Sequence, residues 1–187
     1  MAAPGVTGRR VRDYDDGMMR TLTAAALATT LVAAALKFDA QPGWVAQELT
    51  SAMRVAEFVL PKADGDAEGA SLVVYFFGGQ GGTVQANLDR WIGQMTQPDG
   101  KASKDVAKTS TMTSRGMTIT LVDVPGTYIA EMTPGATERF NKPNFRLRAA
   151  VVETPAGPYF IKVVGPAKTM AKWDASVTAF VRSVRVE

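Results

Sequence analysis

The sequence predicts an α+β fold, in which a mostly antiparallel sheet of about six strands is flanked by a middle helix and a C-terminal helix as an α/β/α sandwich. Three observations predict it. A continuous apolar run over 72–77 ends in a glycine cluster and is followed by a helical apolar period. Segments rich in Val and Thr follow one another across short turns, as hairpins do. No strand-helix-strand unit repeats, so antiparallel pairing is expected.

The apolar run over 72–77 is typical of a strand that is covered on both faces. The helix after the glycine cluster is predicted from one apolar stripe, formed by Val84, Leu88, Trp91, Ile92 and Met95. Thr83 is its expected N-cap, and Pro98 marks its end. This strand and helix together predict a sheet with a helix packed on it.

Alternating apolar residues predict the other strands. A first strand over 53–60 ends at Pro61, and a polar turn leads into the central strand. The segments 106–113 and 117–124 form one predicted hairpin, and Pro125-Gly126 is expected to end it. The segment 127–145 shows no period and is expected to be the longest irregular stretch, where binding residues commonly lie.

A second hairpin is predicted from 147–153 and 159–164, joined by a turn rich in Pro and Gly. After Gly165-Pro166, apolar residues recur at helical spacing and predict a C-terminal amphipathic helix that docks on the sheet; they are Met170, Trp173, Val177, Phe180, Val181 and Val184.

The N-terminal region divides into two expected parts. Residues 1–17 lack apolar periodicity and are interpreted as disordered or absent from the mature protein. The uncharged stretch 21–36 ends near three small residues, Ala33 to Ala35, and resembles a secretory signal peptide. A retained membrane anchor over 21–36 and a buried globular helix are the alternatives.

The whole chain of 187 residues suits one domain plus accessory segments. We expect a signal peptide or anchor with its disordered lead over 1–38, an entry segment over 39–52, with Trp44 packing onto the domain, and a single α+β domain over 53–187.

Composition limits the chemistry. The chain contains no cysteine and no histidine, which excludes disulfides, Ser-His-Asp and Cys-His nucleophile systems, and the usual zinc or copper sites. The formal charge is +3, of which residues 1–38 carry +2, so the remainder is nearly neutral. No basic stripe is present in this part, and nucleic acid is not an expected partner.

Through several of these features the chain resembles an exported bacterial member of the PsbP-like α/β/α sandwich superfamily. They are the signal-like N-terminus, the antiparallel hairpins, the glycine-bounded middle helix, and the final strand YFIKVVG with a helix ending in FVRSVR. The resemblance covers 53–187. It implies a mainly non-enzymatic accessory or assembly factor, as in lumenal subunits attached to photosynthetic membrane complexes, and it transfers no functional residues to this chain.

The glycine cluster before the middle helix is one candidate binding site. Backbone N–H groups and the helix dipole favour an anion at such a position, and the candidate residues are Gly79, Gln80, Gly81, Gly82, Thr83 and Arg90. The cluster matches neither a Walker A loop nor the dinucleotide-binding pattern. The alternative, a strand-to-helix connection that needs positive φ, is favoured. Arg90, Trp91 and Gln94 are also considered as a partner-binding face, although the apolar stripe places Trp91 in the core.

Asp64, Asp66 and Glu68 are candidate metal ligands, because Asp64 to Gly69 matches the first half of a calcium-binding loop. Tyr75 stands where the bidentate Glu is required, so a solvated acidic turn is the favoured interpretation. No cofactor is expected, with a weak calcium site as the one exception.

Three acidic or phenolic residues near the long loop, Asp123, Tyr128 and Glu131, could converge, but their spacing fixes no geometry. Lys162 is considered as a base of lowered pKa, and a solvated strand face is the favoured interpretation for it.

The favoured function is a non-catalytic extracytoplasmic binding or accessory domain that engages a protein partner or a membrane complex. The alternatives are a hydrolase or lyase that works through carboxylates or a divalent cation, and a single-span subunit of a membrane assembly.

Overall fold

The computed structural model describes Met1 and residues 35–187. Apart from Met1, the predicted disordered lead over 1–17 lies outside the described residues, and so does nearly all of the predicted signal peptide or anchor. The part of the chain that is described contains four helices, which are α1 (Val84–Ile92), α2 (Ser103–Val106), α3 (Ala167–Lys172) and α4 (Asp174–Ser183). None of these helices combines the length and the apolar character needed to cross a membrane.

The longer strands are β3 (Arg54–Leu60), β4 (Ala70–Phe76), β6 (Lys108–Ser114), β7 (Met117–Tyr128), β8 (Lys142–Val152) and β9 (Tyr159–Pro166). These are the six strands that the sequence predicts. The predicted total is nevertheless too low, because four strands of two residues are also present, namely β1 (Leu36–Lys37), β2 (Val45–Ala46), β5 (Met95–Thr96) and β10 (Arg185–Val186). Two residues are too few to show an alternating pattern.

Eight strands form one sheet in which β2, β3, β4, β9, β8, β7 and β5 are neighbours in that order, and β6 pairs with β7. All of these pairs are antiparallel. The predicted α+β class and antiparallel pairing are thus confirmed. Strand β9, the fourth of the seven in this order, lies at the centre of the sheet.

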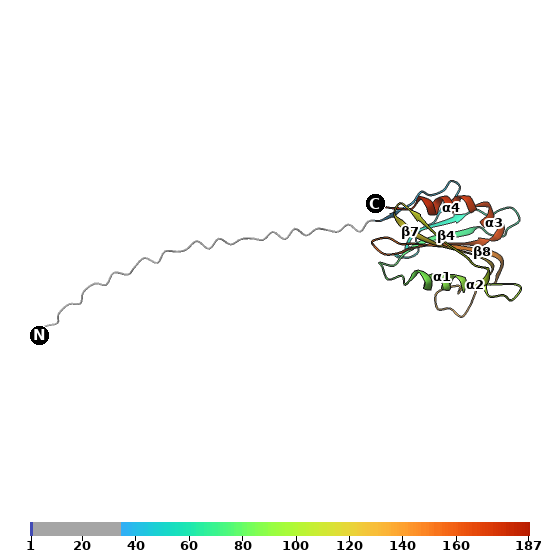
Figure 1. Cartoon of the computed structure of the whole chain (residues 1–187), viewed down its shortest axis with the longest axis horizontal. Coiled ribbons are helices and arrows are strands. Elements are labelled where there is room, and N and C mark those ends of the chain that lie inside the picture. Colours follow the sequence, from blue (N-terminus) through green and yellow to red (C-terminus); the bar gives the residue numbers. More distant parts are fainter. Residues whose placement is uncertain (2–34) are drawn as a thin grey trace. The chain divides into compact units, whose positions relative to one another are not determined.

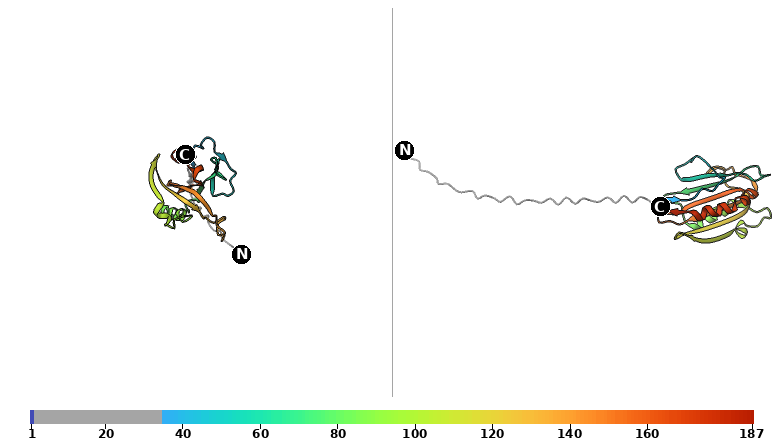
Figure 2. Two further views of the ribbon diagram at one scale, coloured as in Figure 1. Left: turned by 90° about the vertical axis from the view of Figure 1, so that its right-hand side faces the viewer. Right: turned by 90° about the horizontal axis from the view of Figure 1, so that it is seen from above.

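Helices cover both faces of the sheet. Figure 1 shows α1 and α2 on one side and α3 and α4 on the other, and the right-hand view of Figure 2 shows α4 lying over the strands. One core contains Met170, Val177 and Phe180 from the C-terminal helices. The other contains Leu88 and Trp91 from α1. The predicted C-terminal helix is interrupted at Trp173, which separates α3 from α4.

Strand β7 continues through Pro125-Gly126, so the prediction that this pair ends the strand is wrong. Gly126 has φ 146°, and the register shifts between Gly126 and Tyr128. A β-bulge absorbs the irregular backbone here while pairing continues on both sides. The irregular segment between β7 and β8 is therefore 129–141, shorter than the predicted 127–145.

Strand β1, at the start of the described range 35–187, belongs to the folded domain. Leu36 is buried in the core and pairs with Val186 of the C-terminal strand. The expected entry segment contributes β2 to the sheet, and Trp44 packs against Phe180 with ring centroids 5.2 Å apart, as predicted.

Candidate functional site

The residues of β9 alternate between the two cores. Ile161 and Val163 lie in the core under α3 and α4, whereas Phe160 and Val164 belong to the core on the α1 side. By this alternation Lys162 projects to the α1 side. Its neighbours in register are Val73 on β4 and Ala149 on β8, so a cationic side chain rises from an otherwise apolar centre of the sheet.

The amine of Lys162 is held by two neutral oxygens. Its Nζ donates to Gln94 Oε1 at 2.6 Å and to the hydroxyl oxygen of Tyr128 at 3.1 Å. It also lies 5.1 Å from the centroid of the Tyr128 ring, a cation–π distance. No carboxylate within residues 35–187 forms an ion pair with this amine.

Burial of Lys162 and, to a smaller extent, the charge of the nearby Arg90 together lower its pKa to about 8. A buried amine favours the neutral form because the protein interior solvates its charge poorly. The interpretation of Lys162 as part of a solvated face is therefore wrong. The sequence held a signal: in YFIKVVG the lysine is flanked by apolar residues on both sides, which is typical of a central, covered strand.

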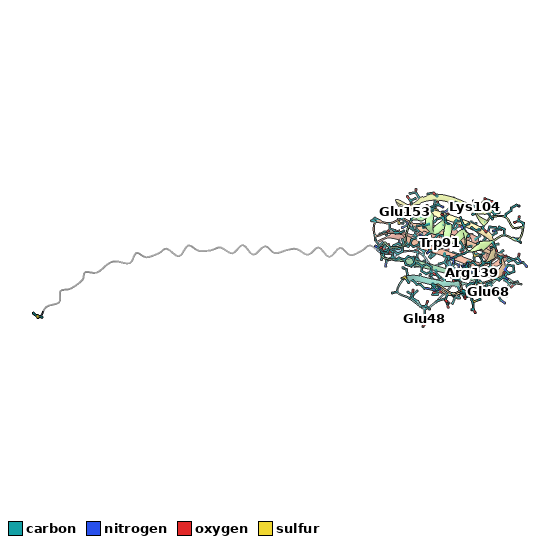
Figure 3. The ribbon with its side chains drawn as sticks, turned by 90° about the horizontal axis from the view of Figure 1, so that it is seen from below. Glu48, Glu68, Trp91, Lys104, Arg139 and Glu153 are labelled. Atoms are coloured by element: carbon teal, nitrogen blue, oxygen red, sulfur yellow. The ribbon has the colours of Figure 1, made fainter. Side chains whose placement is uncertain are left out.

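A cleft of about 660 Å³ opens beside Lys162. Aromatic side chains supply much of its lining, namely Tyr75, Phe77, Trp91, Tyr128, Phe140 and Phe160. Figure 3 views the domain from the α1 side and shows Trp91 near the middle of this face and Arg139 to one side. A second cavity of about 300 Å³ shares Lys162, Tyr75 and Tyr128 with the cleft and extends towards Lys142.

The cleft carries more positive than negative charge. Arg54 pairs with Glu57, and Arg139 pairs with Glu131 at 3.5 Å. Arg90 instead donates to the amide oxygen of Asn87 at 2.6 Å. Among the described residues, Arg90 and Lys162 are thus the two cations of this cleft without a carboxylate partner.

Two phenols of the cleft stay protonated at neutral pH. Burial raises the pKa of Tyr128 to about 12 and raises that of Tyr75 as well. Because the Tyr128 oxygen accepts from Lys162, its own hydrogen remains able to point towards a ligand. The cleft therefore offers an ammonium, a guanidinium and a phenol as donors above an aromatic lining.

The predicted glycine-rich site overlaps this cleft only at Arg90. Thr83 caps α1 by accepting from the Ala86 amide at 3.2 Å, as predicted. The ring of Phe160 packs so closely on Gly81 that a Cβ there would lie 2.2 Å from it. Gly79 and Gly82 have positive φ, as the alternative reading requires, and Gln80 is exposed in the same turn. Anion binding by this loop stays a prediction.

The three candidate metal ligands have other neighbours in the structure. Asp66 accepts from the amide and the hydroxyl of Thr169, at 2.8 and 2.6 Å. Glu68 accepts from Lys142 at 2.7 Å, and Asp64 is exposed. Within residues 35–187 no three acidic side chains gather in a way that could hold a metal ion. Weak calcium binding stays a prediction.

Asp123, Tyr128 and Glu131 do not converge. Asp123 bonds to Arg146 and lines a separate cavity of about 150 Å³ beside α4, whereas Tyr128 and Glu131 line the cleft on the α1 side. Two of the charged residues that line this smaller cavity are paired, because Asp123 pairs with Arg146 and Arg148 pairs with Asp174. The cleft around Lys162 is therefore the better candidate site.

Comparison with known proteins gives likeness of fold alone. No family model and no curated protein matches the sequence. Among solved structures, PA94 of Pseudomonas aeruginosa, a candidate regulator of unknown function, is 12% identical with a TM-score of 0.48, over 75% of this chain and 94% of that one. Cyanobacterial PsbP from Synechocystis sp. PCC 6803 is 10% identical with a TM-score of 0.45, and the match covers 88% of this chain and 99% of that one. PsbP is thus among the structures that this chain resembles, as the sequence predicts.

Proposed function

We propose that this protein is a non-catalytic, exported binding domain and that the cleft around Lys162 holds an anionic ligand. The observation that carries the proposal is the half-buried amine of Lys162, bound only to neutral oxygens and close to Arg90. Two cations without carboxylate partners in one cleft repel each other, and an anion placed between them removes that repulsion.

The lining supports binding of an organic anion. Pockets for organic ligands are mostly apolar, with a few polar groups that fix orientation, and their volumes are roughly 300–1,000 Å³. The cleft has this composition, and its volume of about 660 Å³ lies in this range. A hydrated inorganic ion would make no apolar contact with the aromatic side chains that line the cleft, among them Tyr75, Phe77 and Phe140.

The partner expected from the sequence, a protein or a membrane complex, is compatible with this site. An accessory domain would engage such a partner if the partner presented a carboxylate to the cleft. Export agrees with the same proposal, because the first strand that the structure describes begins at Leu36, directly after the expected cleavage site around Ala33 to Ala35.

Isothermal titration calorimetry with carboxylates of increasing size tests the proposal. We expect binding to the unmodified protein, a loss of at least tenfold in Lys162→Met, and a smaller loss in Arg90→Gln, because each variant removes one uncompensated charge. Lys168→Met is the matched control, because Lys168 is exposed on α3, beside the other face of the sheet. Equal affinity in Lys162→Met and Lys168→Met would contradict the proposal.

A further inference from the structure

We infer that the ligand of this cleft is an aromatic carboxylate, a flat ring system that carries its negative charge at one end. The inference rests on the proposed function and adds the class of ligand. It is drawn from how the aromatic side chains and the cations of the cleft are arranged with respect to one another.

Aromatic rings reach the cleft from two directions. Tyr75 and Phe77 stack at 5.9 Å, with an angle of 7° between their planes; Tyr75 lies in β4 and Phe77 directly follows this strand. Tyr128 and Phe140 stack at 5.5 Å with an angle of 21°, at the end of β7 and in the following loop. Strand β9 lies between β4 and β7 in the sheet, so Lys162 rises between the two ring pairs.

A cation lies over one ring of each of the two stacked pairs. The guanidinium of Arg54 is 5.7 Å from the centroid of Tyr75, and the amine of Lys162 is 5.1 Å from that of Tyr128. A planar guanidinium and an aromatic ring both offer flat surfaces on which another ring can stack. A saturated body of equal size would gain apolar contact here but would lose these stacking contacts.

The charged end of the ligand has a defined place. Lys162, the phenol of Tyr128 and the guanidinium of Arg90 all line the same cleft as the ring pairs. A carboxylate can accept from an ammonium, a phenol and a guanidinium at the same time, because its two oxygens offer about four acceptor positions. The aromatic body would then lie along Tyr75 or Phe140.

Two sources could supply this chemistry. One is a free aromatic acid. The other is the carboxyl-terminal aromatic residue of a protein, in which the main-chain carboxylate stands close to the ring. Both place a negative charge beside a flat apolar surface, and they differ only in what is attached to it.

Calorimetry on the full chain with matched probes tests the inference. The probes are 2-naphthoate, its saturated counterpart decahydro-2-naphthoate, and the neutral 2-naphthamide. We expect 2-naphthoate to bind about tenfold more tightly than the saturated acid, since it gains stacking contacts on the aromatic pairs in addition to apolar contact. The amide should bind at least tenfold more weakly than the naphthoate, because it lacks the charge.

A variant of the lining provides a second test. Phe140 is half-buried, and Phe140→Leu retains an apolar side chain without a ring. We expect this change to reduce the preference for 2-naphthoate over the saturated acid severalfold, whereas Leu49→Ala, at an exposed position away from the cleft, should leave it unchanged.

The outcomes separate the two proposals. If both acids bind equally well and Lys162→Met weakens both, the aromatic class is wrong and the anion site stands. If no carboxylate binds, both proposals are wrong. Gly-Gly-Trp as a free acid and as an amide identifies the source: tighter binding of the peptide acid than of 2-naphthoate points to a protein carboxyl terminus, and the reverse order points to a free acid.

Discussion

The Nζ atom of Lys162 lies 2.6 Å from the side-chain oxygen of Gln94. This contact joins the centre of the sheet to the segment just after α1. The cation that makes it, Lys162, has no carboxylate partner among the described residues. Burying an unpaired charge lowers the stability of the folded protein. Such a charge is kept at binding sites, where a bound ligand of opposite charge compensates the lost stability.

The first prediction concerns stability at neutral pH. Lys162→Met should stabilise the unliganded protein by about 1–2 kcal/mol at pH 7, because it removes the cost of keeping a buried ammonium charged. The loss of the hydrogen bonds to Gln94 and Tyr128 offsets part of the gain. Urea unfolding at pH 7 measures the difference.

The pH dependence of this effect has a definite sign. The pKa of Lys162 is about 8 in the folded protein and 10.5 as its ordinary value, so the unfolded state binds more protons between these values. The stability of the unmodified protein therefore gains from this group as pH rises from about 8 to 10.5, and the advantage of Lys162→Met shrinks across that window. An advantage that stayed constant or grew would contradict a lowered pKa.

The second prediction concerns binding. An anion attracts the protonated form of Lys162, so affinity for 2-naphthoate should fall by several-fold as pH rises from 7 to 9.5 through the pKa of about 8. Calorimetry at both values measures it, and in Lys162→Met the remaining affinity should not change with pH. Buffers of different ionisation enthalpy should also reveal proton uptake on binding near pH 8.

Much of the fold could be predicted because long strands and helices repeat their pattern. Strand β4 contains a continuous apolar run, β9 is apolar on both sides of Lys162, and α1 has one apolar stripe that includes the buried Trp91. The strands of two residues carry no such pattern, and their pairing depends on distant partners. Leu36, for example, is placed by Val186 at the other end of the chain.

The candidate site was harder to predict for the same reason. Arg90 and Lys162 stand 72 positions apart, and no local spacing indicates that they line one cleft. The bulge at Gly126 carries β7 on to Tyr128, which brings its phenol to Lys162. Strand alternation predicts that Lys162 lies on one face of the sheet. Which groups it contacts there, such as Gln94, depends on how α1 packs on that face.

The third prediction separates a structural carboxylate from a metal ligand. Asp66→Ala should destabilise the protein by about 1–3 kcal/mol, because it leaves the buried amide and hydroxyl of Thr169, in the first turn of α3, without their acceptor. Asp64→Ala is the matched control and should change stability by less than about 0.5 kcal/mol, since Asp64 is exposed. Thermal unfolding with and without calcium measures both. A calcium-dependent stabilisation lost in both variants would instead support the calcium-loop hypothesis.

The fourth prediction concerns β1, the first strand that the structure describes. Leu36→Ala should cost about 2–4 kcal/mol, because the side chain is buried in the core beneath α4. Lys37→Ala, at the exposed neighbouring position of β1, should be nearly neutral. Urea unfolding compares the two. If both changes were neutral, the pairing of β1 with β10 would contribute little, and processing of the chain beyond residue 36 would be tolerated.

The fifth prediction concerns the close approach of Gly81 to Phe160. A Cβ at position 81 would lie 2.2 Å from the Phe160 ring, which cannot retreat easily because it packs against Phe77 and Trp91. Gly81→Ala should therefore destabilise the protein by about 1–3 kcal/mol through overpacking.

A second substitution identifies the cause of that loss. In Phe160→Leu the smaller side chain leaves room for the methyl group, so adding Gly81→Ala to this variant should cost less than it costs in the unmodified protein. A double-mutant cycle by urea unfolding measures the coupling. Additive effects would show that contact with the Phe160 ring is not the cause of the loss.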